Sequence, residues 1–540
     1  MQNLTSDQQE VEWQFDALDT RPVRDWLGNR SSDEDPRVGE GETREITDTY
    51  FDTGDWRIYR AGYSLRVRRK GSARKREATM KLLASPDGAP GLRRRREISE
   101  QIESVDDLTA APGPIGERLR ALAGSRKLES IFEVRTRRGA YEISLEGNNV
   151  GEVALDDTEI PLENGEEPAR LRRVEVELDP GALDTLDSFV QELRESCRLW
   201  PATASKYEAA LFARGLTPPE PPDFGPTGVD ASLAIGEVAF AVMREQFGTF
   251  LAHEPGTRLG EDSEALHDMR VASRRMRAAM QIFKDALPVR SRKLRDELKW
   301  IAGVLGEVRD LDVQLEQLED WLSESSPEDR EPLGELRGVL ERKREKARKS
   351  MLRALDSRRY ERFVNSCSEF LQRGPSRRSK AARRPVLDAG PEILGRRHHK
   401  VKKAGDRISK DSTPEEYHEL RKKGKRLRYA LEFHSEIYGK PEQDLAKSLK
   451  SLQDVLGDHQ DAEVAIAQLR ELAPPADGRR RRAGLSPRSL LVMGGIVHRY
   501  ELRAAELRKL FPDSYSKVKG KPWKQLRKKM DGMRPPEGTA

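Results

Sequence analysis

Five segments of the first 180 residues carry charged side chains two residues apart. These pairs are Glu10 and Glu12, Arg66 and Arg68, Arg95 and Glu97, Arg135 and Arg137, and Glu175 and Glu177. Residues two apart in a β-strand lie on the same face, so each pair would present both charges in one direction. Carboxylates can hold a hard divalent cation such as Mg²⁺ or Mn²⁺, and arginines can hold phosphate oxygens. The pattern therefore indicates metal-dependent chemistry on a phosphorylated substrate.

Other kinds of chemistry are excluded for this part of the sequence. All eight histidines lie at His253 or beyond, so neither a histidine general base nor a histidine-ligated zinc site is available in the first half. No P-loop and no GxGxxG motif is present. The two cysteines, Cys197 and Cys367, lie far apart, which argues against a disulfide framework or a cysteine-based zinc site and fits a reducing cytoplasm.

A different set of cations repeats itself in the second half. Each copy has the pattern His-x-x-Arg followed by two more cations on the same predicted helix face: His267, Arg270, Arg274 and Arg277, and then His418, Arg421, Lys425 and Arg428. Stacked like charges destabilise a bare helix, so a bound anion would relieve a cost. Two facing stripes would form a basic groove that suits phosphate groups. The alternative is that each stripe is a solvated helix face.

The offset of 151 residues between the two stripes continues further along the chain. The Val-Leu-Gly sequence at 304–306 recurs at 455–457, and Asp310 recurs as Asp461. One offset without a gap over roughly fifty residues predicts a duplicated helical unit, packed as two bundles related by a pseudo-twofold axis. The two aspartates could pair with the cations of the stripes or serve only as helix-end structure.

Length and charge also divide the chain. Its 540 residues are too many for a single core, which predicts two or more domains. Residues 1–216 carry 33 Lys and Arg against 42 Asp and Glu, whereas residues 217–540 carry 65 against 51. The basic half indicates a polyanionic partner: polyphosphate, nucleic acid or an acidic lipid surface. Aromatic residues make up only 6% of the chain, which argues against base stacking and so against single-stranded nucleic acid.

The chain shows no sign of membrane insertion or secretion. No apolar run approaches the length of a membrane span, and the first residues lack a signal-peptide pattern. We therefore expect a cytoplasmic protein without membrane contact, and association with polyphosphate granules is a further expectation. The oligomeric state stays open.

Hydrophobic periodicity gives the expected fold. Alternating apolar and polar residues recur in residues 10–180 and predict an antiparallel barrel or sandwich, and the charged pairs favour a closed sheet with a polar lumen. Helical periodicity replaces this pattern after residue 230. We expect a multidomain α+β protein with a β-tunnel domain and flanking helices at 1–215, a linker at 216–229, and an all-α domain at 230–535 with repeats at about 230–372 and 386–530.

Two known families resemble this sequence. Residues 10–210 resemble a CYTH domain of the triphosphate tunnel metalloenzyme family, through Glu10-x-Glu12, YFDTGDWRIYRAGYSLRVRR (50–69), MKLL around Lys81, Arg95-x-Glu97, Glu175-x-Glu177 and Ser205-Lys206-Tyr207. Residues 230–530 resemble a CHAD domain through HDMRVASRRMR, LGEVRDLD and HELRKKGKRLRYALEF. CHAD members are helical, carry such histidines and basic helices, and bind polyphosphate.

The resemblance implies roles for particular residues. CYTH members form an eight-stranded tunnel and hydrolyse or cyclise triphosphate substrates with a divalent metal. The metal, Mg²⁺ or Mn²⁺, would be held by the catalytic carboxylates Glu10, Glu12, Glu175 and Glu177, with Asp156 and Glu97 as secondary candidates. Triphosphate would contact Arg66, Arg68, Lys81, Arg95, Arg135, Arg137 and Lys206. The eight residues of the two stripes would contact polyphosphate.

One departure from the CYTH pattern bears on activity. The family signature is Glu-x-Glu-x-Lys, and Gln14 stands in place of the lysine. Loss of this cation removes one charged contact to a triphosphate. We expect metal-dependent hydrolysis of inorganic triphosphate or short polyphosphate, with polyphosphate binding by the helical domain. The alternatives are a non-catalytic polyphosphate-binding protein with a degenerate tunnel, an adenylate cyclase, and nucleic-acid binding by the basic half.

Overall fold

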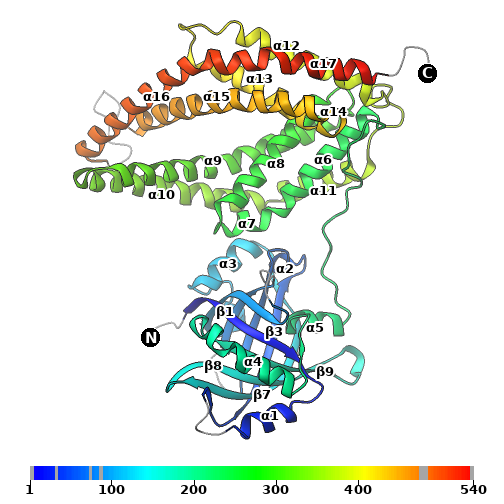
Figure 1. Cartoon of the computed structure of the whole chain (residues 1–540), viewed down its shortest axis with the longest axis vertical. Helices are drawn as coiled ribbons and strands as arrows, with labels where there is room; N and C mark the ends of the chain where they lie inside the picture. Colours follow the sequence, from blue (N-terminus) through cyan, green and yellow to red (C-terminus); the bar gives the residue numbers. More distant parts are fainter. Residues whose placement is uncertain (1–4, 31–34, 72–75, 84–88, 473–484, 535–540) are drawn as a thin grey trace. The chain divides into compact units, whose positions relative to one another are not determined.

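The structure, a computed structural model, describes residues 5–30, 35–71, 76–83, 89–472 and 485–534. The chain divides into two compact units, Met1–Glu220 and Pro221–Ala540 (Figure 1). The first unit is built mainly of strands and the second of helices. The predicted limits of the domains and of the linker stay predictions, and residue 535 lies outside the described residues.

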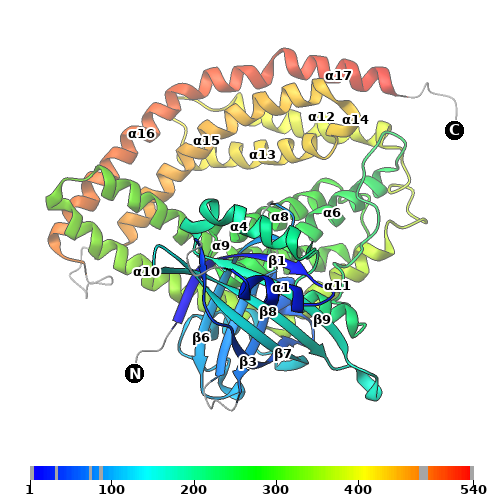
Figure 2. The ribbon, with the colours of Figure 1, turned by 60° about the horizontal axis from the view of Figure 1, so that its bottom comes forward.

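Eight of the described strands close into one antiparallel barrel (Figure 2). Around the barrel their order is β1 (Thr5–Asp16), β6 (Leu92–Ile102), β5 (Arg76–Leu82), β4 (Tyr63–Lys70), β3 (Glu42–Thr53), β7 (Leu128–Leu145), β8 (Asn148–Ile160) and β9 (Ala169–Leu178). Pairing of β1 with β9 closes the ring and sets Glu12 opposite Glu177. Two short strands extend the sheet, β2 (Arg37–Val38) beside β7 and β10 (Trp200–Pro201) beside β1. The predicted eight-stranded tunnel is confirmed.

Alternation along the strands sends apolar side chains outward and charged side chains inward. Val174 and Val176 of β9 belong to an apolar cluster with α1 (Arg21–Gly28) and α4 (Leu183–Ser196), which lie against the outside of the barrel. Their neighbour Glu175 faces the lumen. Burial of the outer face supplies hydrophobic stabilisation, so the inner face is free to be polar.

Other helices cover the rest of the barrel. α2 (Arg57–Arg60) contacts β3 and β4, and α3 (Pro114–Ala123) contacts β5 and β6. Helix α5 (Lys206–Ala213) begins with a capping box, in which the Ser205 hydroxyl accepts from the Glu208 backbone N–H and the Glu208 carboxylate accepts from the Ser205 N–H. This cap starts the helix at Lys206, whose side chain enters the lumen. Short 3-10 helices span Val105–Asp107, Glu163–Gly165 and Pro180–Ala182.

The second unit is all-helical. Its helices are α6 (Ile235–Ala252), α7 (Glu254–Leu259), α8 (Ser263–Ile282), α9 (Ser291–Glu324), α10 (Pro327–Leu355), α11 (Arg358–Arg373), α12 (Val386–Gly405), α13 (Pro414–Glu432), α14 (Ser435–Tyr438), α15 (Lys440–Leu472), α16 (Pro487–Lys519) and α17 (Lys521–Met533). In the described part of the chain, no helix combines the length and the apolar character needed to cross a bilayer.

The predicted duplication is confirmed by the backbone. Helices α6 and α12 begin 151 residues apart, at Ile235 and Val386. The Ile235 N–H donates to the Arg384 carbonyl at 2.8 Å, and the Val386 N–H donates to the Leu233 carbonyl at 2.9 Å. These two hydrogen bonds exchange places under the same offset, as a pseudo-twofold axis between the repeats requires. Helix α8 contacts its counterpart α13, and α10 contacts α16.

Part of the predicted linker packs on the helical unit. The ring of Phe224 lies 5.1 Å from that of Phe247, and the Arg244 guanidinium donates to the Pro226 carbonyl at 3.1 Å. The Gln372 amide donates to the Asp223 carbonyl at 3.3 Å. Residues from 221 onward therefore contribute to the core of the second unit.

We expect the fragments 1–220 and 221–540 to fold separately, because each has its own apolar cores. Each should show one cooperative thermal transition by circular dichroism. A fragment that begins at residue 230 should be about 3 kcal/mol less stable than 221–540, since it loses the buried Phe224 ring. Equal stability of the two helical fragments would contradict the packing of Phe224.

Candidate functional site

The barrel encloses a polar cavity of about 150 Å³. Its charged lining comes from six strands and from α5: Glu10, Glu12, Arg66, Arg68, Lys70, Glu77, Lys81, Arg95, Glu97, Arg138, Glu175, Glu177 and Lys206. Both signs of charge thus occur in one enclosed space. Most of these charges are buried or half-buried, and each buried one is costly unless an opposite charge compensates it, so the pairing among them determines what the site can bind.

Lys81 lies at the centre of a group of carboxylates. Its Nζ is 2.9 Å from Glu12 Oε1 and 3.5 Å from Glu97 Oε2, and it also contacts the Glu10 carboxylate. Arg95 Nη2 donates to Glu12 Oε1 at 2.5 Å. Burial, followed by the charge of Glu12, raises the pKa of Glu10 to about 8 despite the opposing effect of Lys81. Carboxylates here exceed the cations that compensate them.

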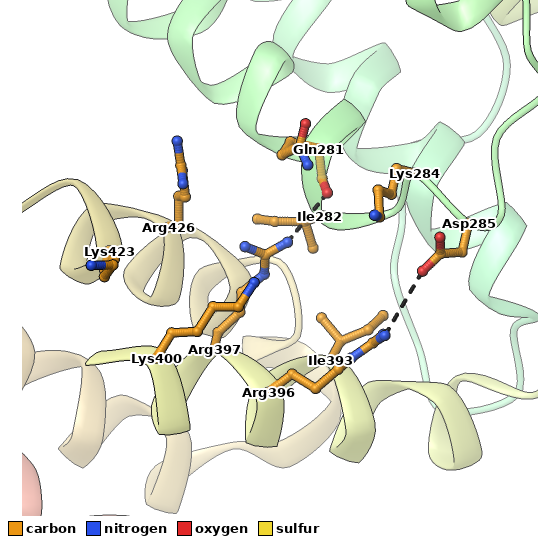
Figure 3. Close-up of a pocket in the computed structure, with 10 residues that line it drawn as sticks. All are labelled: Gln281, Ile282, Lys284, Asp285, Ile393, Arg396, Arg397, Lys400, Lys423 and Arg426. Atoms are coloured by element: carbon orange, nitrogen blue, oxygen red, sulfur yellow. Dashed lines mark hydrogen bonds and ion pairs between the residues drawn. The ribbon is translucent and has the colours of Figure 1, made fainter. Parts of the chain in front are cut away.

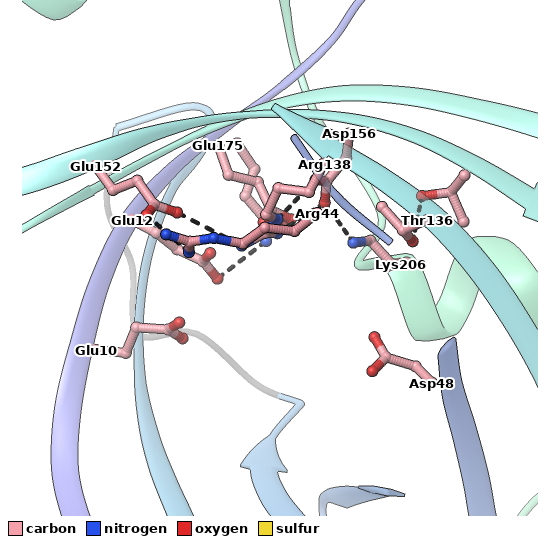
Figure 4. Close-up of polar contacts among 12 residues, drawn as sticks. Glu10, Glu12, Arg44, Asp48, Thr136, Arg138, Glu152, Asp156, Glu175 and Lys206 are labelled. Atoms are coloured by element: carbon pink, nitrogen blue, oxygen red, sulfur yellow. Dashed lines mark hydrogen bonds and ion pairs between the residues drawn. The ribbon is translucent and has the colours of Figure 1, made fainter. Parts of the chain in front are cut away.

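A second ion-paired group joins β7, β8, β9 and α5 within the lumen (Figure 4). The Arg138 guanidinium donates to both oxygens of Asp156 at 2.7 Å and to Glu175 at 2.5 Å. Lys206 Nζ donates to Asp156 at 2.6 Å. Burial opposes ionisation of Glu175, but Lys206 and Arg138 outweigh it and hold the pKa of Glu175 well below its usual range. This group is balanced, unlike the one around Glu10.

The two arginines of β4 also face the lumen. Arg68 is fixed by a bidentate pair with Asp48, with both distances at 2.8 Å. Arg66 is held more loosely, because its guanidinium nitrogens lie 3.9 Å from the carboxylates of Asp48 and Glu97. Arg66 therefore has donors to offer an incoming phosphate. Sequence reasoning missed Asp48. Its position in the alternating pattern of β3 does not distinguish it from other polar strand residues.

Arg135 and Arg137, which were predicted to contact triphosphate, do not line the lumen. Their side chains are 66% and 72% exposed and lie on the outer face of β7. Thr136 and Arg138 face the lumen instead, and Arg138 pairs across the strands with Asp156. Because arginines occupy both 137 and 138, alternation alone allowed either face. The buried carboxylate of Asp156 selects Arg138, a residue that the sequence analysis omitted.

The predicted metal ligands are divided between the two groups. Glu175 is engaged by Arg138, whereas Glu10, Glu12 and Glu177 are close together. Burial and the neighbouring Glu12 raise the pKa of Glu177. Gln14, only 3% exposed, donates to Glu12 at 2.9 Å, and its amide oxygen has no hydrogen-bond partner among the described residues.

These residues fit a divalent cation by chemistry, although not in their present arrangement. Carboxylate and amide oxygens are the ligands that Mg²⁺ and Mn²⁺ prefer, and a cation would relieve the raised pKa of Glu10 and Glu177. In the part of the chain that is described, no three or more His, Cys, Asp or Glu side chains are arranged to hold a metal. Lys81 Nζ contacts Glu10 and Glu12, so metal binding there requires Lys81 to move.

The basic stripes of the helical unit meet where α8 contacts α13. Arg274, Arg277 and Lys425 line a shared cavity of about 470 Å³, together with other cations from α9 and α13. Arg270 pairs with Asp310 at 2.9 Å, and the repeated pair Arg421 and Asp461 is 3.7 Å apart. Pairing of the two aspartates with the stripes is therefore confirmed.

The remaining stripe residues lie elsewhere on the same helices. Arg428 pairs with Glu432 of its own helix at 3.2 Å. His267 and His418 are half-buried and are not among the residues that line the shared cavity. The structure thus brings three of the eight predicted polyphosphate contacts to one cavity, together with Lys422 and Arg426 of α13, which lie beside the second stripe.

Cations in this cavity lack enough nearby carboxylates. Burial, followed by the charges of Arg421 and Arg274, lowers the pKa of Lys425 to about 7. Burial likewise lowers the pKa of Arg421, although Asp461 opposes the shift. A bound polyanion would reverse both effects, because it supplies negative charge where the folded chain does not.

Family comparison accounts for both units. The CYTH domain family matches residues 27–210, and the CHAD domain family matches residues 241–470. The chain carries a CYTH domain followed by a CHAD domain. Strand β1, with Glu10, Glu12 and Gln14, precedes the matched CYTH residues, and its place in the domain rests on barrel closure with β6 and β9.

Sequence and structure comparisons give relatives of this chain. Two uncharacterised proteins of Mycobacterium tuberculosis, from strains CDC 1551 and H37Rv, are 26% identical over 496 residues, covering 87% of this chain and 89% of theirs. The CHAD domain of the plant Ricinus communis is 25% identical, covering 55% of this chain and 96% of that chain with a TM-score of 0.46. A Hippeastrum protein described as having a dominant triphosphatase activity is 19% identical, covering 39% of this chain and 98% of that chain with a TM-score of 0.30.

Replacing Lys425 with Met should stabilise the ligand-free protein. The pKa of Lys425 is lower in the folded than in the unfolded chain, so its charge destabilises the fold fully below pH 7, and this cost declines as the pH rises toward the unfolded value. The melting temperature should rise by a few degrees at pH 6 and by less at pH 9. Lys422→Met, which removes an exposed lysine paired with Glu419, is the control and should show no gain. A loss of stability from Lys425→Met at both pH values would contradict the assignment.

Proposed function

We propose that the CYTH domain is a metal-dependent hydrolase of inorganic triphosphate or short polyphosphate, and that the CHAD domain binds polyphosphate. One observation carries the proposal for the CYTH domain. Its lumen sets phosphate-binding cations, including Arg66 and Lys206, opposite a cluster of carboxylates that is short of positive charge. A substrate phosphate chain together with a divalent cation would satisfy both needs.

Substrate binding would exchange partners within the lumen. Arg66, Arg68 and Lys206 now face carboxylates, and phosphate oxygens would take over some of these charge-assisted hydrogen bonds. Lys81 could turn from Glu10 and Glu12 toward a phosphate, and so free both carboxylates. The cations would then neutralise charge that develops on the phosphoryl oxygens as the bond to the leaving group breaks.

The metal and the proton have identifiable places. A divalent cation held by Glu10, Glu12 and Glu177 would polarise a phosphoryl oxygen. A bound cation would keep Glu10 ionised, because it would offset the burial and the charge of Glu12 that raise the pKa of Glu10 to about 8 in the ligand-free protein. An ionised Glu10 carboxylate would then be able to accept the proton of a water molecule that attacks the terminal phosphorus. The bridging P–O bond breaks in the same step, and the shortened phosphate leaves.

Gln14 favours a second candidate function. Its neutral amide occupies the place of the motif lysine and donates to Glu12, where a lysine would add a positive charge. The tunnel would then bind triphosphate with one cation fewer and without turnover. In that case the whole chain is a polyphosphate-binding protein. Metal-dependent phosphate release separates the two candidates.

The decisive test is phosphate release from inorganic triphosphate with Mg²⁺, with Mn²⁺ and with a chelator. Metal-dependent release should fall by about 100-fold or more in Arg66→Ala/Arg68→Ala, because two charge-assisted contacts are lost. Arg135→Ala/Arg137→Ala is the matched control, since it removes the same charge from the outer face of the barrel. Glu177→Gln should raise the metal concentration that is needed for half-maximal phosphate release.

Two results would change the proposal. Triphosphate binding without release at any metal concentration would establish the non-catalytic candidate. Equal losses in the two double variants would show that the lumen is not the site of hydrolysis.

Polyphosphate binding by the CHAD domain should decline as the pH rises through about 7, because the free protein then loses the charge on Lys425. Fluorescence anisotropy of a labelled chain at constant salt measures this. Lys425→Arg keeps the charge and should flatten the decline between pH 7 and pH 9, whereas Arg274→Gln/Arg277→Gln should weaken binding at every pH. An unchanged pH profile in Lys425→Arg would remove this lysine from the binding site.

A further inference from the structure

A second basic cavity lies beside the cavity that α8 and α13 share, which we call the groove. It has a volume of about 150 Å³ and lies where the end of α8 approaches α12 and α13 (Figure 3). Six cations line it, and none of them is among the eight predicted polyphosphate contacts: Lys284, Arg396, Arg397, Lys400, Lys423 and Arg426. Asp285 is the one carboxylate among the lining residues. We call this cavity the α12 pocket.

Most of these charges have no compensating partner. Arg396 is 3.9 Å from Asp285, and Arg397 donates to the Gln281 backbone carbonyl at 3.2 Å. Within the described ranges, Lys400, Lys423 and Arg426 make no hydrogen bond or ion pair. The buried Nε of Arg397 also has no partner. The pocket therefore holds several donors that are unused by the fold.

Burial and neighbouring cations both disfavour a positive charge at Arg397. Burial, followed by the nearby charges of Arg426 and Arg396, lowers the pKa of Arg397 to about 10. Guanidinium groups rarely approach deprotonation, so this shift reflects an environment that strongly disfavours positive charge. An anion in the pocket would remove that penalty.

The duplicated fold supplies an internal comparison. The offset of 151 residues places acidic or neutral residues at the equivalent position of the other repeat: Glu245 for Arg396, Gln246 for Arg397, Thr249 for Lys400, Ala272 for Lys423, Glu432 for Gln281 and Glu436 for Asp285. Arg275 corresponds to Arg426 and is neutralised there by Glu432 at 2.5 Å. The repeat folds with a structural ion pair at that position, so the cations of the α12 pocket are not a requirement of the fold.

We propose that the α12 pocket is an anion site for a group of two or three linked phosphates. Arginine forks and lysines match phosphate oxygens, and a compact cavity with several cations favours adjacent phosphates over a single carboxylate. The lining contains no aromatic residue on which a nucleic-acid base could stack. The pocket shares Gln281 and Arg426 with the cavity lined by Arg274 and Lys425.

The linked phosphates could come from two sources. One is a free ligand such as pyrophosphate, and this case does not depend on the function proposed above. The other is a stretch of a longer chain that continues from the groove, and this case rests on the proposed polyphosphate binding by the CHAD domain. Because the equivalent position in the other repeat is acidic, a chain would occupy the groove in an asymmetric manner, with one portion in the α12 pocket.

The test compares Lys400→Gln/Lys423→Gln with Lys524→Gln/Lys528→Gln in the full-length chain. The second pair removes the same charge from exposed positions of α17. Both are made in the Arg66→Ala/Arg68→Ala background, so that the tunnel does not contribute. Calorimetric titration with pyrophosphate, inorganic triphosphate and long-chain polyphosphate at one ionic strength gives the affinities, and melting curves check folding.

One outcome supports the site and a free ligand. In it, Lys400→Gln/Lys423→Gln lowers the affinity for pyrophosphate by about tenfold, and Lys524→Gln/Lys528→Gln lowers it by less than about twofold. A tenfold loss confined to long-chain polyphosphate supports the site and assigns it to the chain. Equal effects of the two pairs on all three probes would overturn it. Arg274→Gln/Arg277→Gln tests the groove separately. If long-chain polyphosphate still binds with unchanged affinity, the groove is not its binding site, and the proposal for the α12 pocket is unaffected.

Discussion

Charge balance in an enclosed space is the constraint on which the barrel depends. Each ion buried in the lumen costs several kcal/mol unless an opposite charge or hydrogen bonds offset it. Pairing of neighbouring strands provides most of the offsets, because it sets Asp48 opposite Arg68 and Asp156 opposite Arg138, and α5 adds Lys206 beside Asp156. Where carboxylates exceed cations, at Glu10 and Glu177, the pKa rises instead. That local excess is the feature on which the proposed metal site rests.

The CHAD domain has the opposite imbalance. Its cations exceed the carboxylates within reach, both between α8 and α13 and in the α12 pocket. The lowered pKa of Lys425 and of Arg397 shows that the folded chain bears this repulsion without a ligand. Such strain persists only where the surrounding packing is strong enough, and here a large apolar cluster continues through both repeats. The equivalent positions of the two repeats differ. Arg275 forms an ion pair with Glu432, whereas its counterpart Arg426 lines the α12 pocket.

If the CHAD domain binds polyanions as proposed, its presence on one chain with the tunnel domain has a simple physical consequence. Tethering raises the effective concentration of a ligand held by one domain around the other, without any contact between the two sites. Similarity to the mycobacterial proteins extends across both domains, so the pairing itself is shared. If both proposals hold, the CHAD domain would retain the same class of anion that the CYTH domain cleaves.

Much of this organisation is determined by the sequence alone. Strand alternation, the change to helical periodicity near residue 230 and the repeat at an offset of 151 are regularities of neighbouring residues, and strand and helix geometry convert them directly into faces and repeats. The same reasoning singled out Glu10 and Arg66 from the spacing of their charged pairs, whereas Lys81 was implied by the resemblance to the CYTH family.

Tertiary structure decided which charges meet. Arg137 and Arg138 are equivalent by alternation, and only Asp156 on the neighbouring strand places Arg138 in the lumen. Likewise Arg397 and Arg426 come together only because α12 packs on α13 and α8. The cost of burying a charge depends on its partners, and these partners come from distant parts of the chain. Local sequence therefore specifies which face of a strand or helix a residue occupies, but not which charged partners its side chain contacts.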